Sequence, residues 1–262
     1  MQEYLFCIDS DGCAMDTMTY KHNFFFGPIA AEVFQVTNKE KFLEEWNIIN
    51  LYSKTRGVNR FVGLVMTLQK VGYVGIDDLI AWTNETTELS NRSLQKEIAK
   101  KQSQDLKNAL LWSNQVNDAI ENSKDLAKPF ANVKEGLTYL HRFGKVIIVS
   151  SANKEAVESE WQKHGLLSEV DELYCQDQGK KADIIKRQLK EGFEPKKVLM
   201  IGDAPGDLMA AQDNGIYFYP ILVNHEAASW KNLADVIPSF IKGNYQAIFE
   251  QQQQSFWNNL TR

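Results

Sequence analysis

The sequence predicts an α/β protein whose parallel sheet, covered by helices on both faces, is interrupted by a long all-helical segment. From Val133 onward, short apolar segments alternate with amphipathic segments of helical period, which is typical of a parallel sheet. One further apolar strand, from Tyr4 to Ile8, stands alone near the N-terminus and must join the same sheet. More than a hundred residues between them show helical spacing, so they form an insertion.

The insertion is expected to consist of several amphipathic helices. Thr37 and Glu40 form an expected capping box at the start of one of these helices. In that helix, apolar residues recur at helical spacing from Phe42 to Leu51. Further helices are expected over residues 61–72, 77–83 and 91–120.

The second part of the chain gives the rest of the sheet. Strands are expected at residues 145–149, 172–175, 197–201 and 216–219, and helices at 133–142, 154–164, 181–190 and 207–213. A glycine follows each of these helices closely, as at Gly144 after the first. We therefore expect residues 1–15 and 129–262 to form the α/β core domain and residues 16–128 to form a helical domain.

Composition excludes several classes of protein. The 262 residues are 44% hydrophobic and carry a net charge of −5, which provides no basic face for nucleic acid or an anionic membrane. Three cysteines are too few for a disulfide framework or a Cys-rich zinc site. The N-terminal residues show no targeting signal, and no apolar run reaches the length of a membrane span. These features predict a cytoplasmic protein with reduced thiols and leave its oligomeric state open.

Two carboxylates, Asp9 and Asp11, follow the first strand, and Gly12 then releases the turn. Because side chains alternate along a strand, both carboxylates can project to one side while Ser10 points away. Neighbouring carboxylates repel each other, so they need a cation or a tuned proton balance. A turn that caps the next helix is the structural alternative.

The other strand ends and helix starts carry groups of matching chemistry. They are Ser150 and Ser151 after the second strand, Lys180 and Lys181 at the start of the helix at 181–190, and Asp203 and Asp207 after the fourth strand. The carboxyl ends of parallel strands share one edge of the sheet, so we expect these groups to meet there. Carboxylates, a hydroxyl and an ammonium facing one point suit a hard cation together with a phosphate. Singly, these residues also fit as helix N-caps, a solvated helix start or a turn residue.

In this order the motifs resemble those of the haloacid dehalogenase superfamily. They are Asp9-Ser10-Asp11-Gly12, Ser150 after an apolar strand, Lys181 opening a helix, and Gly202-Asp203 followed by Asp207. The resemblance implies a Rossmann-like core, an inserted helical cap, Mg²⁺ and an aspartyl-phosphate intermediate. The dehalogenases that give the superfamily its name lack an aspartate at the position of Asp11, so phosphate chemistry is favoured here.

The resemblance also implies a role for each residue. Asp9 is expected to be the nucleophile and Asp11 the general acid and base, while Ser150 and Lys181 hold the phosphoryl oxygens. Lys180 is the alternative to Lys181.

Metal and substrate ligands follow from the same motifs. The expected Mg²⁺ ligands are Asp9, the backbone carbonyl of Asp11, Asp203 and, as a further ligand, Asp207. Ser151 is expected to help bind the substrate.

A turn in the insertion, Arg56-Gly57-Val58-Asn59-Arg60, is similar to the substrate-contacting cap loop of β-phosphoglucomutase and related sugar-phosphate enzymes. The resemblance implies that Arg56 or Arg60 meets a distal anionic group of the substrate. A helix-connecting turn with solvated arginines explains the same residues.

These features predict a Mg²⁺-dependent phosphatase that acts on a small phosphorylated metabolite and binds neither nucleic acid nor membrane. A phosphomutase of the β-phosphoglucomutase type and a non-catalytic binding protein on the same fold are the alternatives.

Overall fold

The computed structural model describes residues 3–123 and 126–260 and divides the chain into two compact units. The α/β unit contains the residues up to 18 and from 127 onward, and the helical unit contains residues 19–126. The sequence placed these boundaries after residue 15 and before residue 129. The ends of the expected core domain, residues 1–2 and 261–262, and residues 124–125 of the expected helical domain lie outside the described residues.

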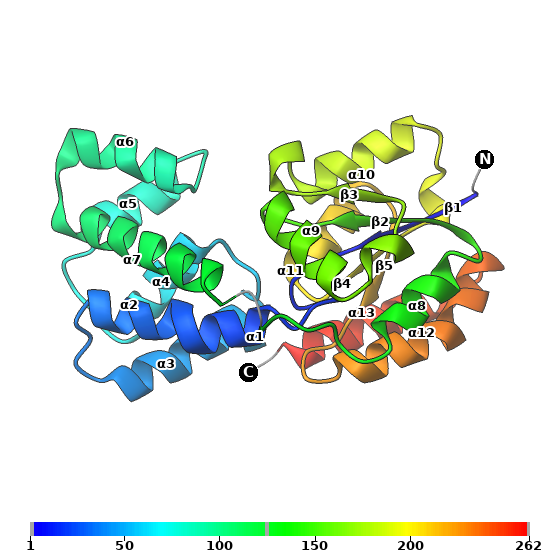
Figure 1. Ribbon diagram of the computed structural model, residues 1–262, viewed down its shortest axis with the longest axis horizontal. Helices are drawn as coiled ribbons and strands as arrows, with labels where there is room; N and C mark the ends of the chain where they lie inside the picture. Colours follow the sequence, from blue (N-terminus) through cyan, green and yellow to red (C-terminus); the bar gives the residue numbers. More distant parts are fainter. Residues whose placement is uncertain (1–2, 124–125, 261–262) are drawn as a thin grey trace. The chain divides into compact units, whose positions relative to one another are not determined.

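The α/β unit is built on a five-stranded parallel sheet with the strand order β3-β2-β1-β4-β5 (Figure 1). The strands are β1 (Tyr4–Ile8), β2 (Gly144–Val149), β3 (Glu172–Tyr174), β4 (Val198–Gly202) and β5 (Tyr217–Pro220). The N-terminal strand β1 is central, and its Cys7 pairs with Ile147 on one side and Met200 on the other. This arrangement confirms the predicted parallel sheet and places the carboxyl ends of β1, β2 and β4 side by side.

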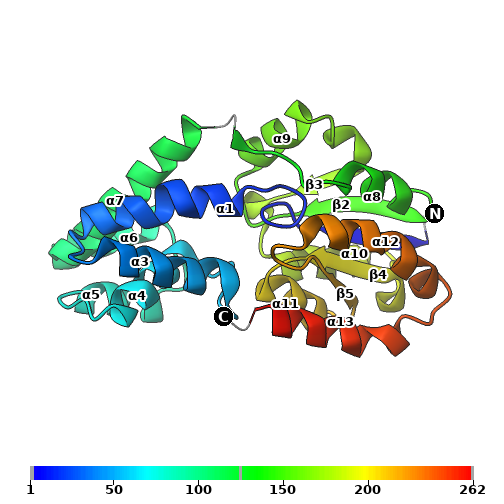
Figure 2. The same cartoon turned by 90° about the horizontal axis from the view of Figure 1, so that it is seen from below.

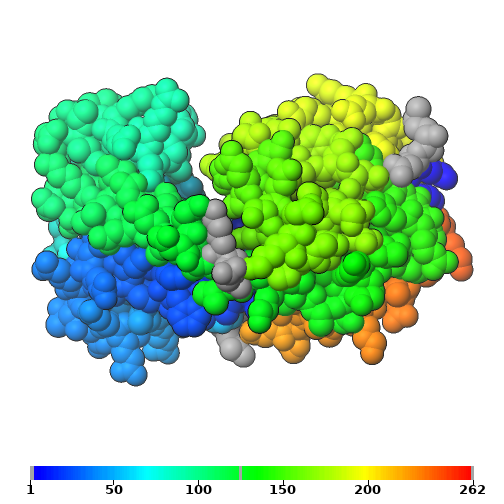
Figure 3. All heavy atoms as spheres, viewed as in Figure 1, coloured from blue at the N-terminus to red at the C-terminus, as the bar shows by residue number. Residues whose placement is uncertain are grey.

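Helices cover both faces of this sheet. They are α8 (Val133–Leu140), α9 (Lys154–Lys163), α10 (Lys181–Lys190), α11 (Pro205–Asp213), α12 (Glu226–Ile241) and α13 (Gln246–Asn259), with short 3-10 turns at Leu167–Glu169, Gln176–Gln178 and Pro195–Lys197. Helices α8 and α12 lie over one face, and α10 and α11 over the other (Figures 1 and 2). Side chains such as Phe6 and Phe240, whose ring centroids are 5.9 Å apart, fill the space between strand and helix. In the space-filling view little of the blue first strand of this unit is visible (Figure 3).

The helical unit packs around aromatic side chains. Its helices are α1 (Met18–Lys21), α2 (Gly27–Val33), α3 (Lys39–Asn47), α4 (Arg60–Lys70), α5 (Asp77–Glu85), α6 (Asn91–Lys101) and α7 (Gln104–Glu121), with π-helical turns at His22–Phe26 and Ile48–Tyr52. Trp112 lies at its centre, with edge-to-face contacts to Trp46 and Phe61. In the part of the chain that the structure describes, no helix combines the length and apolarity needed to cross a bilayer.

The chain passes between the units through two segments that are bonded to each other. The N–H of Phe130 donates to the carbonyl oxygen of Ala14 at 3.0 Å, and the N–H of Asp16 donates to that of Lys128 at 2.7 Å. The two ends of the insertion therefore leave the α/β unit side by side.

Two local predictions in the insertion were wrong. Helix α3 is capped by Asn38, whose Oδ1 accepts the N–H of Lys41 at 3.0 Å, rather than by a box of Thr37 and Glu40. The helical stretch expected at 91–120 is two helices, because Gln102 adopts a left-handed conformation with φ of 53°.

Gly144 also differs from its prediction, since it begins β2 instead of ending α8. A Cβ atom at this position would lie 2.1 Å from the carbonyl oxygen of Tyr4. The glycine therefore permits β1 and β2 to approach closely.

Candidate active site

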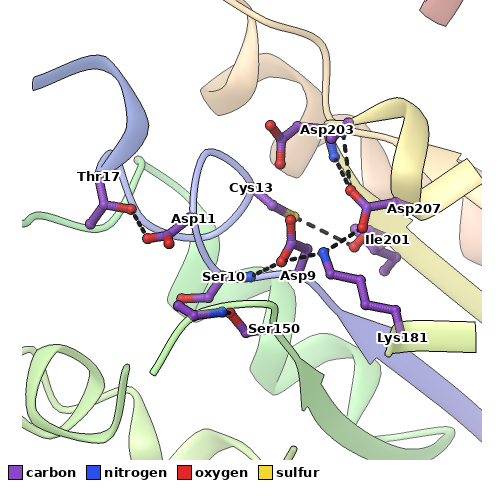
Figure 4. A network of polar contacts seen from close by, with 12 residues as sticks. Asp9, Ser10, Asp11, Cys13, Thr17, Ser150, Lys181, Ile201, Asp203 and Asp207 are labelled. Carbon is purple, nitrogen blue, oxygen red and sulfur yellow. Dashed lines mark hydrogen bonds and ion pairs between the residues drawn. The ribbon is translucent and has the colours of Figure 1, made fainter. Parts of the chain in front are cut away.

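Asp9 and Lys181 form the centre of a buried charge cluster at the carboxyl end of β1. The Nζ atom of Lys181 lies 2.7 Å from Asp9 Oδ1 and 2.6 Å from Asp207 Oδ1 (Figure 4). Lys181 is the first residue of α10, so the start of that helix delivers the ammonium group to the strand ends. Lys180, the other lysine considered from the sequence, is the exposed N-cap of the same helix.

Asp207 serves the backbone and the cluster at once. Its Oδ2 atom accepts the N–H groups of Asp203 at 3.1 Å and Ala204 at 3.0 Å, while Oδ1 binds Lys181. A Cβ atom at Gly202 would lie 2.3 Å from Asp207 Oδ2, so only glycine leaves room for this carboxylate. The capping function and the site function that the sequence offered as alternatives for Asp207 are therefore compatible.

The acidic residues of this cluster suit a divalent cation. Asp9, Asp203 and Asp207 are buried, and each offers a carboxylate oxygen within 4.8 Å of those of the other two. Three carboxylates lie close together in this buried site, where the ammonium group of Lys181 pairs with Asp9 and Asp207, so the cluster has an excess of negative charge that a cation would offset. Hard carboxylate oxygens are the ligands that Mg²⁺ prefers, so the residues present fit this ion.

The pKa values of Asp9 and Lys181 are both raised, for different reasons. Burial, followed by the repulsion of Asp207, raises the pKa of Asp9 well above its usual range, and the attraction of Lys181 offsets only part of this rise. Burial alone would lower the pKa of Lys181, but the carboxylates of Asp207 and Asp9 raise it above its ordinary value. Lys181 therefore stays charged, whereas Asp9 needs a further cation to be a stable anion.

Asp11 lies apart from this cluster. Its carboxylate is hydrogen-bonded to the hydroxyl of Thr17, and in Figure 4 it points away from Asp9. We expected Asp9 and Asp11 to project to one side, but the regular alternation ends with β1 at Ile8, and Gly12 then turns the chain with φ of 81°. The Asp11 side chain is therefore outside the group of Asp9, Asp203 and Asp207. The direction of this side chain does not affect the expected role of the Asp11 backbone carbonyl.

Ser150 and Ser151 follow β2, as the sequence indicated, but differ in exposure. Ser150 is buried, and its Oγ accepts the N–H of Ala152 at 3.1 Å. Its own N–H donates to the carbonyl oxygen of Tyr174 at 2.9 Å, which ties the end of β2 to β3. Ser151 is exposed.

The two arginines of the predicted substrate turn belong to the helical unit and contact groups within it. Arg56 is only 3% exposed, and its Nη1 donates to the carbonyl oxygen of Leu51 at 2.9 Å. Arg60 donates from Nη1 to Asn117 Oδ1 at 2.7 Å and to Ser113 Oγ at 3.3 Å. Burial lowers the pKa of Arg60 to about 10. The interpretation of this turn as two solvated arginines is wrong for Arg56.

Two residues at the site were not found from the sequence. Trp161 and Trp230, on α9 and α12, donate hydrogen bonds to the turn that follows β1. Their places on the buried faces of amphipathic helices were the signal, but that pattern cannot tell a core tryptophan from one that contacts a functional loop.

The comparisons with known proteins agree with this architecture. The sequence model of the haloacid dehalogenase-like hydrolase family matches residues 80–221, more than half of the chain. The chain therefore belongs to the haloacid dehalogenase-like hydrolases, which confirms the family predicted from the sequence. A comparison with curated proteins gives no match.

Several solved structures share the fold at low identity. A predicted phosphoglycolate phosphatase from Haemophilus somnus is 15% identical with a TM-score of 0.55, over 84% of this chain and 85% of that chain. A protein assigned the same activity by prediction, from Lactobacillus delbrueckii subsp. bulgaricus, is 17% identical with a TM-score of 0.51, over 84% and 86%. The magnesium-bound YfnB of Bacillus subtilis, assigned as a HAD-hydrolase by prediction, is 11% identical with a TM-score of 0.51, over 84% and 87%. Similarity at this level shows a common fold.

Proposed function

We propose that the protein is a Mg²⁺-dependent phosphatase that hydrolyses a small phosphorylated metabolite, with Asp9 as the nucleophile. The observation that supports this most is the buried group of Asp9, Asp203 and Asp207, in which Asp9 and Asp207 pair with the ammonium of Lys181. Buried like charges are costly for a fold, and apolar side chains of similar size would be at least as stable there. Their presence in a hydrolase of this family favours a catalytic site.

The reaction would proceed in two displacements at phosphorus. An oxygen of Asp9 attacks the phosphorus atom and forms an acyl phosphate while the bond to the leaving oxygen breaks, and Asp11 gives that oxygen a proton. Asp11 then takes a proton from a water molecule, whose oxygen attacks the same phosphorus and frees Asp9 and inorganic phosphate. Lys181 and Ser150 would hold the phosphoryl oxygens.

Asp9, Asp203 and the backbone carbonyl of Asp11, with Asp207 as a further ligand, would hold the Mg²⁺. The bound ion supplies positive charge that stabilises the phosphoryl oxygens. Asp207 already uses one oxygen for two backbone N–H groups, so it would also fix the loop that presents Asp203.

Arg60 would bind a second anionic group of the substrate. Among residues 3–123 and 126–260 its contacts are neutral, namely Asn117, Ser113 and the ring of Phe26, whose centroid lies 4.9 Å from the guanidinium carbon. An anionic ligand would stabilise this partly buried cation, because the groups around it are neutral. Arg56 would support this turn through Leu51, and exposed Ser151 would contact the substrate from the α/β unit.

The same arginine favours the second candidate, a phosphomutase of the β-phosphoglucomutase type, because a sugar bisphosphate carries two anionic groups. The two candidates differ in their products. A phosphatase releases inorganic phosphate from several sugar phosphates, whereas a mutase interconverts their isomers. Arg60→Met should raise KM for a substrate with two anionic groups by about tenfold and leave turnover of p-nitrophenyl phosphate unchanged.

The central test compares the hydrolysis of p-nitrophenyl phosphate by the wild type and Asp9→Asn, with Mg²⁺ and with EDTA. Loss of the nucleophile should lower kcat at least about 1,000-fold, and EDTA should abolish the wild-type rate. Asp183→Asn, the same change at an exposed position of α10, is the matched control and should keep full activity. Equal rates for the wild type and Asp9→Asn would remove Asp9 as the nucleophile, and metal-dependent ligand binding without turnover would favour the binding protein.

A further inference from the structure

Two buried indole groups contact the turn that follows β1. The Nε1–H of Trp161 on α9 donates to Ser10 Oγ at 2.9 Å, and the Nε1–H of Trp230 on α12 donates to the carbonyl oxygen of Cys13 at 2.8 Å. All four residues are buried. Indole groups from two helices that are distant in sequence therefore donate hydrogen bonds to opposite ends of the turn that contains Asp11.

The turn is otherwise bonded mostly to itself. The carbonyl oxygen of Ser10 accepts the N–H groups of Cys13, Ala14 and Met15 at 3.3, 3.0 and 2.9 Å, and the N–H of Gly12 donates to Met15 at 2.8 Å. Such a closed set of bonds fixes the shape of the turn but not its orientation on the sheet. Contacts from other elements must set that orientation.

Contacts with β4 hold the turn on one side. The N–H of Asp9 donates to the carbonyl oxygen of Ile201 at 3.0 Å, and the Cys13 thiol contacts the same oxygen at 3.5 Å. A thiol is a weak donor, so beyond Asp9 the stronger hydrogen-bond donors to the turn are the two indole groups and the N–H of Phe130, which donates to the carbonyl oxygen of Ala14 at 3.0 Å.

The two indoles are themselves held in place. A Cβ atom at Gly136 would lie 2.6 Å from Cε3 of Trp230, so the backbone of α8 packs directly against that ring. Trp161 has no exposed surface. A large ring enclosed in a close-packed core cannot change rotamer without displacing its neighbours, so each indole is a rigid donor.

We propose that Trp161 and Trp230 are positioning residues that orient the turn between Asp9 and Asp11 for phosphoryl transfer. Ser10 lies between the two aspartates, so a bond to its side chain restrains the backbone segment that carries both. This inference rests on the proposed function, because the restraint matters for catalysis only if both aspartates act on one phosphoryl group. Small displacements of catalytic groups lower rates strongly, whereas ground-state binding is much less sensitive.

The Ser10–Trp161 bond can be tested from both ends with Trp161→Phe, Ser10→Ala and the double variant. Each single variant should lower kcat for p-nitrophenyl phosphate about tenfold with KM changed less than twofold, and the double variant should be no worse than either, because both remove the same bond. Trp230→Phe should also lower kcat. Tyr245→Phe is the matched control, because it deletes a buried ring donor to the carbonyl oxygen of Phe218, at 2.8 Å in the same unit, and should leave kcat unchanged.

Amide hydrogen exchange of the peptide covering residues 9–15 gives a readout that does not depend on activity. The Ser10, Trp161 and Trp230 variants should exchange faster there than the wild type and Tyr245→Phe, in the presence of Mg²⁺ and at matched global stability. An active wild type whose variants keep both the rate and the exchange of Tyr245→Phe would overturn the inference and leave the proposed function intact. If Asp9→Asn equals the wild type in rate, the proposed function fails and the catalytic part of the inference fails with it, while exchange still decides whether the indoles restrain the turn.

Discussion

In the α/β unit the buried charged side chains of the site gather at one point, whereas in the helical unit the buried polar side chains bind separate parts of the backbone. Asp9, Asp203, Asp207 and Lys181 share one small volume. In the helical unit, Asn50 donates to the carbonyl oxygen of Trp46.

Asp105 shows the second pattern most clearly. Its Oδ2 accepts the N–H of Leu79 at 2.9 Å, and its Oδ1 accepts the hydroxyl of Ser103 at 2.5 Å. A carboxylate bonded in this way stabilises the start of a helix and needs no ligand. Burial of a charged residue therefore does not by itself indicate function, whereas burial of several like charges together does.

Removing the ammonium group of Lys181 from the cluster should have the greatest effect on stability. Lys181→Met leaves three buried carboxylates facing one another, and should lower the free energy of unfolding by about 3–5 kcal/mol in EDTA. Mg²⁺ should restore part of this loss, since it binds the folded state and offsets the same charge. Urea unfolding with and without Mg²⁺ measures both effects.

Lys145→Met is the matched control. Lys145 pairs with Glu172 at 2.7 Å, but the side chain of Glu172 is 42% exposed, so the pair is screened by water. Its loss should change the free energy of unfolding by less than about 1 kcal/mol, with no response to Mg²⁺. Equal losses of unfolding free energy for the two lysine variants would contradict the distinction between a buried charge cluster and a solvent-exposed ion pair.

A smaller effect is expected from crowding Asp207. Gly202→Ala places a methyl group 2.3 Å from Asp207 Oδ2, and should lower the free energy of unfolding by about 2–3 kcal/mol and weaken Mg²⁺ binding. Gly206→Ala, in the first turn of α11, meets no atom within 4 Å and should instead stabilise by about 0.5–1 kcal/mol. Calorimetric Mg²⁺ titration and thermal unfolding measure these effects. Equal Mg²⁺ affinity and equal stability of the two variants would contradict the requirement for glycine at position 202.

In the helical unit the expected effect is smaller again and independent of metal. Asp105→Ala removes the acceptors of Leu79 and Ser103, which should cost about 1–2 kcal/mol. Asp105→Asn keeps one acceptor oxygen and should fall between Asp105→Ala and the wild type. A response of either variant to Mg²⁺, measured by urea unfolding, would show that this carboxylate is not purely structural.

The smallest effect concerns alkaline pH and the α/β unit. Burial raises the pKa of Cys175 from 9.0 to about 11, so the thiol is largely neutral in both states below about pH 8. As the pH rises above this value, the unfolded chain loses the proton first, and the free energy of unfolding falls by up to about 1.4 kcal/mol per pH unit. Cys175→Ala lacks this contribution, so its stability relative to the wild type should improve by about 1 kcal/mol between pH 8 and pH 10. Parallel pH profiles of the unfolding free energy for the wild type and Cys175→Ala, measured in urea, would contradict this contribution of the thiol.

Much of the fold could be predicted because buried parallel strands are continuous apolar runs, and each is followed by a helix of clear period. The convergence of Asp9, Lys181, Asp203 and Asp207 could be predicted for a related reason, since the ends of neighbouring parallel strands share one edge. Their chemical roles stay predictions.

What could not be predicted depends on tertiary packing. The direction of Asp11 is set by the backbone of the turn at Gly12, and the burial of Arg56 by neighbours that its own sequence context does not reveal. Thr37 and Asn38 are adjacent residues with similar capping ability, so only the backbone conformation decides which one caps α3. The contacts of Trp161 and Trp230 join helices to a turn more than two hundred residues away in one case.

The paired backbone bonds of Ala14 with Phe130 and of Asp16 with Lys128 have a consequence for how the protein folds. During synthesis, β1 leaves the ribosome long before its partner β2, and the central pair of the sheet must close a loop that contains the whole helical unit. A helical unit that has already folded brings its two ends together and so removes most of the entropy cost of that closure. Weakening the aromatic core of the helical unit should therefore slow formation of the sheet.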